Sequence, residues 1–173
     1  MLLLFRKLGL IIFLFPNGLI RYSAMEILAI IISSILGTAI MTGFSQVVES
    51  LTDNKFNEAH LLNRFLNYLN FTTKKIGDNY YLGWIIHFAI GVTMATILYC
   101  YYFYLSEGVF IWTGLFLGFI LGIIGVAGWL ILVSYHKNPP KINWRFFFVQ
   151  LIVAHMIFGV TVTWVLARFV TNF

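Results

Sequence analysis

Long apolar runs separated by short polar segments dominate the pattern of residues along the chain. A membrane-spanning helix needs about 20 mostly apolar residues. The pattern predicts an all-α, polytopic four-helix bundle with spans at about residues 27–48, 80–105, 109–135 and 146–167. Because only residues 105–108 link the second and third spans, we expect these two to form a tight antiparallel hairpin. Pro139 and Pro140 end the third span.

One longer polar segment, residues 49–79, has the periodicity of an amphipathic helix. Its apolar residues at helical spacing are Leu61, Leu62, Phe65, Leu66 and Leu69. The polar residues on its other faces are Glu58, Asn63, Arg64, Asn67 and Asn70. This pattern predicts a helix at about residues 56–70. Two positions are compatible with it: along the membrane surface, or packed over the end of the bundle.

The first 24 residues have a more ambiguous pattern. Arg6 and Lys7 followed by a short apolar run resemble the start of a signal peptide. Pro16 ends that run before it is long enough to span a membrane. A short interfacial or re-entrant helix, a cleaved segment and translation from Met25 all fit this pattern. Residues 25–173 are expected to form one membrane domain.

The composition excludes most other classes of protein. Of the 173 residues, 61% are hydrophobic and only 10% are charged, whereas soluble domains contain about 25% charged residues. A chain this apolar cannot cover a soluble surface with polar groups. The lipid bilayer is therefore the expected partner, and nucleic acid is not, even at a net charge of +5. The single cysteine, Cys100, excludes an internal disulfide.

Basic residues are concentrated in two polar segments, residues 49–79 and 136–145, which four spans place on the same side of the membrane. They are Lys55, Arg64, Lys74, Lys75, Lys137, Lys141 and Arg145. Loops rich in Lys and Arg face the cytoplasm in membrane proteins. Both segments are therefore expected to be cytoplasmic.

Two of the spans contain the same short motif. His87 begins H-x-x-x-G-V-T in the second span, and His155 begins it in the fourth. These spans run in the same direction, so the two histidines are expected at a similar depth in the cytoplasmic half. The repeat indicates two related helical hairpins, an arrangement that in transporters often places the binding site between the halves.

Small residues recur at helix-packing intervals in all four spans, and such residues mark places where helices approach closely in lipid. The predicted packing positions are Ser33, Gly37, Gly83, Gly91, Gly114, Gly118, Gly122 and Gly159. His87 and His155 share these faces, so their side chains are expected to point into the bundle. The glycines of the third span form a face that could serve a second copy of the chain, which predicts a homo-oligomer.

The two histidines are functional candidates because ionisable residues are rare within spans. The candidate interior polar site consists of His87, His155, Gln150, Gln46 and Glu49. Such a site could handle protons, ions or a small solute, since histidine changes its charge near neutral pH. Alternatively, His87 and His155, with Glu49 and His136 as weaker candidates, could bind a transition metal or haem in a redox protein. In a third alternative, the histidines only join helices in a structural or assembly subunit.

Sequence motifs of common enzyme active sites are absent. The chain has no H-E-x-x-H, C-x-x-C, P-loop or G-x-S-x-G motif. No Asp or Glu lies within the second, third or fourth span. No catalytic residue is therefore assigned, and the sequence favours a protein that is not an enzyme and has no cofactor.

Residues 83–91 and 154–159 carry a family resemblance. The first segment reads G-W-I-I-H-F-A-I-G and the second A-H-M-I-F-G. Over about residues 27–169 the chain resembles an uncharacterised bacterial inner-membrane family, a domain of unknown function with the segment G-W-x-x-H-[YF]-A-I-G. The resemblance implies a four-helix fold in a bacterial inner membrane and no particular activity. The family usually has an acidic residue within the first span, where this chain has Thr42, Ser45 and Gln46.

Overall fold

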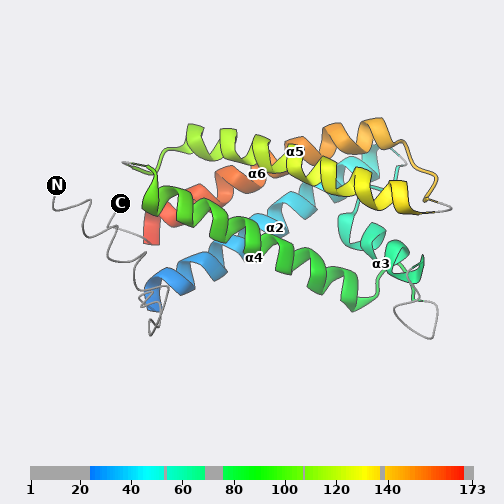
Figure 1. Ribbon diagram of the computed structural model, residues 1–173, viewed down its shortest axis with the longest axis horizontal. Coiled ribbons are helices and arrows are strands. Elements are labelled where there is room, and N and C mark those ends of the chain that lie inside the picture. Colours follow the sequence, from blue (N-terminus) through cyan, green and yellow to red (C-terminus); the bar gives the residue numbers. More distant parts are fainter. Residues whose placement is uncertain (1–23, 53, 69–75, 107, 137–138, 170–173) are drawn as a thin grey trace.

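The structure is a computed structural model that describes residues 24–52, 54–68, 76–106, 108–136 and 139–169. Its helices are α2 (Ala24–Thr52), α3 (Glu58–Tyr68), α4 (Tyr81–Tyr104), α5 (Ile111–Tyr135) and α6 (Trp144–Phe169) (Figure 1). All of these except α3 are long and apolar enough to cross a membrane. The prediction of an all-α four-span bundle is therefore confirmed. The alternatives for residues 1–23 lie outside the described residues.

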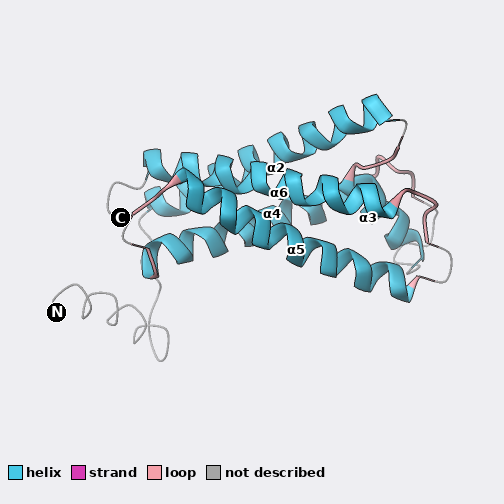
Figure 2. Cartoon of the chain, turned by 90° about the horizontal axis from the view of Figure 1, so that it is seen from above, coloured by secondary structure: helices cyan, strands magenta, loops and turns pink. Residues whose placement is uncertain are grey.

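The four long helices run side by side, and α3 lies at one end of them (Figures 1 and 2). α6 packs against α5 on one side and against α2 on the other, and α2 packs in turn against α4. α4 and α5 make little contact with each other, and α4 slopes away from α5 towards the α3 end (Figure 1). The prediction of a tight hairpin was wrong because a short connection joins two helices that pack on different neighbours.

Glycines bring α5 and α6 close together. A Cβ added to Gly122 would lie 2.9 Å from Ile152 Cα, and one added to Gly159 would lie 2.8 Å from Gly118 Cα. Only glycine permits such an approach of two backbones. The glycine stripe of α5 is thus occupied by α6 within the same chain, which corrects the expectation that this face is free for a second copy. A homo-oligomer would have to use another face.

The remaining small residues lie between other helices. A Cβ on Gly91 of α4 would overlap with the Thr38 hydroxyl of α2. Gly37 of α2 faces α6, where a Cβ would lie 2.9 Å from the Phe158 ring. Ser33 is fully buried, and its hydroxyl donates to the carbonyl of Ile30 at 3.0 Å. These contacts close the α2–α4 and α2–α6 sides of the bundle.

Asparagine side chains attach α3 to the start of α4. Asn63 Nδ2 donates to the carbonyl oxygens of Asp78 and Tyr80, each at 2.7 Å, and Asn63 Oδ1 accepts from the Gly83 N–H at 2.8 Å. One turn later, the Asn67 amide exchanges two 2.8 Å hydrogen bonds with the backbone of Ile76. The bond to Gly83 satisfies an N–H that the start of α4 leaves unpaired, and the others satisfy backbone groups of the segment before it. They also fix the angle between α3 and α4.

The position of α3 answers the question that its periodicity left open. Phe56 and Leu61 are 0% and 1% exposed, so the helix packs over the end of the bundle. On its outer side, Arg64 Nε donates to Asp78 Oδ1 at 3.0 Å. This hydrogen bond and the charge of Arg64 hold the pKa of Asp78 below its usual value.

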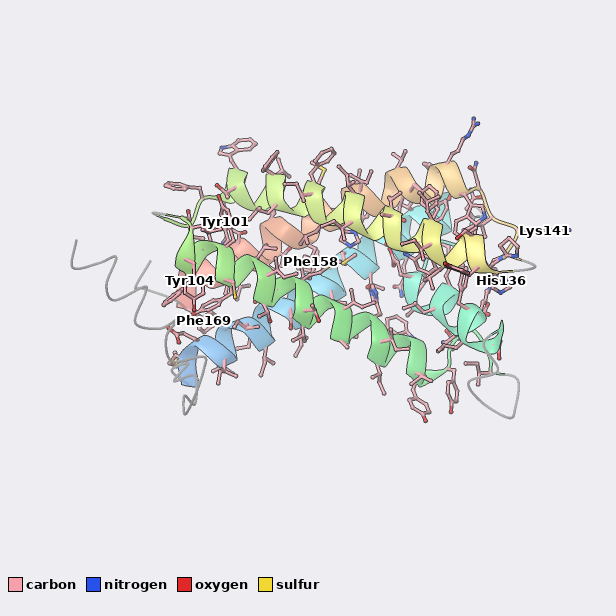
Figure 3. The ribbon with its side chains drawn as sticks, viewed as in Figure 1. Tyr101, Tyr104, His136, Lys141, Phe158 and Phe169 are labelled. Carbon is pink, nitrogen blue, oxygen red and sulfur yellow. The ribbon has the colours of Figure 1, made fainter. Side chains whose placement is uncertain are left out.

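The two ends of the bundle differ in their side chains. Tyr101, Tyr104 and Phe169 lie at one end, and His136 and Lys141 lie at the other, the end that α3 covers (Figure 3). Aromatic residues of this kind are enriched where helices leave the hydrocarbon region. The spans therefore run from the end with Tyr101, Tyr104 and Phe169 to the α3 end, where aromatic residues such as Tyr81 and Trp144 also lie.

Candidate functional site

A pocket of about 390 Å³ lies in the side of the bundle where α4 and α5 are separated. Ile90, Ile124 and Ile131 line it and are 41%, 56% and 58% exposed. Leu151 and Phe158 of α6 also line it and are 1% and 0% exposed. The exposed isoleucines therefore form its mouth, and the two α6 residues form its floor. Because the mouth is apolar and lies between spanning helices, the pocket opens towards lipid.

His87 lines this pocket from α4 and is joined to α2. Its Nε2 lies 2.9 Å from Thr42 Oγ1, and the Thr42 hydroxyl donates its one proton to the carbonyl of Thr38 at 2.7 Å. While Thr42 donates to Thr38, its oxygen can only accept from His87, which places the proton of a neutral His87 ring on Nε2. The lone pair is then on Nδ1, which has no hydrogen bond to any described residue.

His155 lines the same pocket from α6. Its Nδ1 lies 2.8 Å from the carbonyl oxygen of Leu151, one turn earlier in the same helix. A carbonyl can only accept, so Nδ1 carries the proton and Nε2 carries the lone pair of the neutral ring. The ring lies against α5, where a Cβ on Gly125 would be 3.3 Å from Nε2. Both predicted histidines thus reach one pocket, each with one nitrogen available as an acceptor.

A residue that the sequence did not single out, Glu58 in the first turn of α3, also lines the pocket. It is only 2% exposed, and its Oε1 accepts from the Ser45 hydroxyl at 2.9 Å. Ser45 in turn accepts from Gln150 Nε2 at 2.6 Å. Burial raises the pKa of Glu58 to about 7, against the opposing effect of its hydrogen bonds. The Glu58 carboxyl therefore changes its protonation state near neutral pH.

The other predicted site residues have different positions. Gln150 is buried next to Ser45, whereas Gln46 is exposed on the outer face of α2. Glu49 lies at the α3 end of α2, and its Oε2 accepts from the N–H groups of Phe56 and Asn57 at 2.9 and 3.0 Å. Glu49 therefore caps the entry to α3. Of these three described residues, only Gln150 is linked by hydrogen bonds to a pocket residue, through Ser45 to Glu58.

His136 is also placed away from the pocket, since its ring packs edge-on against Phe65 with centroids 4.9 Å apart. The described residues contain no group of three or more His, Cys, Asp or Glu side chains that could share a metal ion. Metal or haem binding through His87 and His155 stays a prediction.

Thr38 is unusual among the hydroxyl residues of α2. Thr42, like Ser33, donates to a carbonyl group one turn earlier, and the Ser45 hydroxyl can donate to the carbonyl of Met41 or to Glu58. The Thr38 hydroxyl is buried, lines the pocket and has no hydrogen-bond partner among the residues described. The polar lining of the pocket therefore comprises a free hydroxyl, two imidazoles and one carboxyl, set in apolar walls.

Comparison of the chain with protein-family models, curated proteins and solved structures gives no match. The fold and its apolar helices define the class as an integral, multi-pass membrane protein. The resemblance to a bacterial inner-membrane family stays a prediction.

Proposed function

We propose that this is a bacterial inner-membrane protein that takes up a small molecule dissolved in the bilayer and holds it against His87 and His155. The observation that carries the proposal is the pocket between α4 and α5, with its exposed apolar mouth and its two imidazole acceptors. Ligand sites in proteins are typically apolar cavities of a few hundred Å³ with a few polar groups that fix orientation. This pocket has that size and that lining.

The position of the mouth favours a ligand from lipid over a water-soluble one. A solute that entered from water would have to pass the isoleucines at the mouth, and these offer no hydrogen bonds to replace its hydration. A molecule already dissolved in the hydrocarbon region loses no such bonds. The small solute considered from the sequence is therefore an apolar or amphipathic one.

The alternative in which the histidines only join helices accounts for one nitrogen of each ring. His87 Nε2 bonds across to α2, but the bond of His155 Nδ1 stays within α6. A histidine that served only as interhelical glue would bond to a neighbouring helix. A ligand role gives a use to the remaining nitrogen of both rings.

The proposal includes the orientation of the protein in the membrane, with the α3 end in the cytoplasm. Lys55, Arg64, Lys141 and Arg145 belong to α3 and the segments at its end of the bundle. The excess of basic residues in these loops supports a cytoplasmic α3 end. The resemblance of residues 83–91 supports the bacterial inner membrane.

Photolabelling tests the proposed uptake. We expect a diazirine-bearing octanol, added to the protein in lipid vesicles, to form adducts with Leu151 and Phe158, which the fold hides from bulk lipid. Gly128 lines the pocket and has nothing within 4 Å of an added Cβ, so Gly128→Phe can fill the space. It should remove these adducts while the protein keeps its melting temperature.

Gly43→Phe is the matched control. Gly43 also has nothing within 4 Å of an added Cβ, but it lies on α2 outside the pocket. This variant should be labelled like the wild type. Adducts confined to residues at the mouth, or floor adducts that persist in Gly128→Phe, would contradict uptake into the pocket.

A further inference from the structure

The pocket contains a buried carboxyl group without a counter-ion. Glu58 Oε2 has no hydrogen-bond partner among the described residues, and Glu58 forms no ion pair with any of them. Among the residues that the structure describes, no Lys or Arg lines the pocket. A buried charge without a partner is strongly unfavourable, so an ionised Glu58 requires a cation from outside the described fold.

The other polar groups of the pocket are suited to the same kind of ligand. His155 Nε2 offers a lone pair because the Leu151 carbonyl holds the ring proton on Nδ1, and His87 Nδ1 offers one while Thr42 donates to Thr38. The pocket also has donors in the Thr38 hydroxyl and the Trp129 indole, but neither carries the positive charge that would balance a buried anion such as a fatty acid or a phosphate ester. A ligand with several N–H donors would find acceptors in Glu58, the two imidazoles and the Thr38 oxygen.

We infer that the ligand is a membrane-dissolved amine whose protonated nitrogen pairs with the carboxylate of Glu58 while its apolar chain fills the space between α4 and α5. This inference rests on the proposed function, since it identifies the class of molecule that the same pocket takes up. The ammonium supplies the missing counter-ion for Glu58. The apolar walls accept the hydrocarbon part.

Binding of the amine replaces the proton on Glu58 with the ammonium group of the ligand. Below pH 7 Glu58 is protonated in the empty pocket; on binding, its O–H bond breaks and the proton leaves to water, while the ammonium keeps all of its own protons. Ser45 permits both states, because its hydroxyl can donate to Glu58 Oε1 at 2.9 Å or to the carbonyl of Met41 at 3.1 Å. When the Ser45 proton turns to Met41, its oxygen can accept from a protonated Glu58.

The pH dependence of binding follows from this exchange. Glu58 has a pKa of about 7, so affinity for a permanently protonated amine should rise about tenfold per pH unit below pH 7 and level off above it. Glu49 of α2 interacts electrostatically with Glu58, and the titratable side chains that share its pocket are His87 of α4 and His155 of α6. α5 presents no titratable side chain to the pocket. Protonation of the histidines would also repel a cation, so the test must separate their effect from that of Glu58.

Calorimetric titration of the full chain in nanodiscs of zwitterionic lipid, corrected against empty nanodiscs, makes this separation. The probes are n-octylamine, which is protonated below its pKa of about 10, and n-octanol, its neutral analogue. We expect the amine to bind about 10- to 100-fold more tightly than the alcohol at pH 8, as a hydrogen bond to a charged group implies. Titration at pH 6 in two buffers of different ionisation enthalpy should show release of close to one proton per amine.

Glu58→Gln keeps the acceptor for Ser45 and removes the charge. It should abolish the preference for the amine and the proton release, and leave octanol binding unchanged. Glu26→Gln, at the opposite end of α2 and outside the pocket, is the matched control and should behave like the wild type.

Octanol and octylamine binding with equal affinity to the wild type would overturn the inference about the amine and leave the proposed function standing. A pH dependence of amine affinity that persists in Glu58→Gln would have the same consequence, because protonation of His87 or His155 would then cause it. If neither probe binds and Gly128→Phe changes nothing, the proposed function itself fails.

Discussion

Glycine has different effects in the two halves of α5. In the first half, a Cβ on Gly114 or Gly118 would overlap with atoms of Thr163 or His155 on α6. In the second half, Gly128 faces the pocket, and a Cβ there would meet nothing within 4 Å. An absent side chain therefore brings two helices together in one half and leaves a space in the other. A glycine stripe marks a close approach only where another helix lies over it.

The neighbours of α4 and α5 decide which outcome occurs. α5 is seated on α6, whereas α4 is held by α2 and by α3. Asn63 and Gly83 fix the start of α4 against α3, at the end of the bundle where α4 and α5 are apart. α4 and α5 are thus held by different neighbours. The α5–α6 seam, the close contact at Gly114, Gly118, Gly122 and Gly159, and the pocket should therefore respond differently to substitution.

The largest effect is expected at the seam. Gly118→Leu would place a side chain against the backbone of α6, where even a Cβ overlaps with the carbonyl oxygen of His155 and lies 2.9 Å from Met156 Cα. Backbone atoms cannot move aside without separating the helices, so we expect the free energy of unfolding to fall by more than about 3 kcal/mol. SDS-induced unfolding in mixed micelles, followed by far-ultraviolet circular dichroism, measures this loss. An unchanged unfolding midpoint would show that the α5–α6 seam is not as close as described.

Glu58, which lines the pocket, should make the stability of the protein depend on pH. Folded Glu58 has a pKa of about 7, against 4.5 for an unburied glutamate. The folded protein therefore binds more protons than the unfolded chain between these values, and stability falls as pH rises from about 4.5 to about 7. The loss is at most about 3 kcal/mol. Unfolding across this range should show the slope in the wild type but not in Glu58→Gln; an identical slope in both would assign it to another group.

Release of α3 from α4 should loosen the start of α4 and leave the contact between α5 and α6 intact. Asn63→Ala removes three hydrogen bonds, so we expect a loss of about 2 kcal/mol. Hydrogen exchange should become faster at Gly83 and around the first turn of α4, with no change along α5 and α6. Asn54→Ala, which removes one bond to the carbonyl of Thr52, is the control. Faster exchange spread over all helices would mean that α3 supports the whole bundle rather than the angle of α4.

The spans and α3 could be predicted because apolar runs and helical periodicity act along the chain. The α4–α5 gap could not, because the length of residues 105–108 limits only how far apart two helix ends are. It does not determine whether the rest of the two helices touch. That depends on contacts such as Asn63 with Gly83, between residues 20 positions apart.

The histidines were found because the repeated motif places them at one depth, and the structure brings both to one pocket. Glu58 was missed because it lies on the polar side of α3, which a helix on the membrane surface would expose. Its burial depends on Ser45 and Gln150, which come from two other helices. These two polar residues within apolar spans were the available signal, since each needs a partner in lipid. Gln46 was misplaced because the next residue in a helix points about 100° away from Ser45.

The smallest effect is expected at Gly128, in the second half of α5. Gly128→Ala adds a methyl group that meets nothing within 4 Å, and alanine is the better helix former by up to about 1 kcal/mol. The variant should therefore be slightly more stable than the wild type in SDS unfolding, and Gly43→Ala on α2 should show the same small gain. Because a methyl group is too small to fill a pocket of about 390 Å³, the floor of the pocket should still be photolabelled. A loss of stability at Gly128 without one at Gly43 would mean that another helix covers α5 at this position, and that the pocket is closed in the membrane.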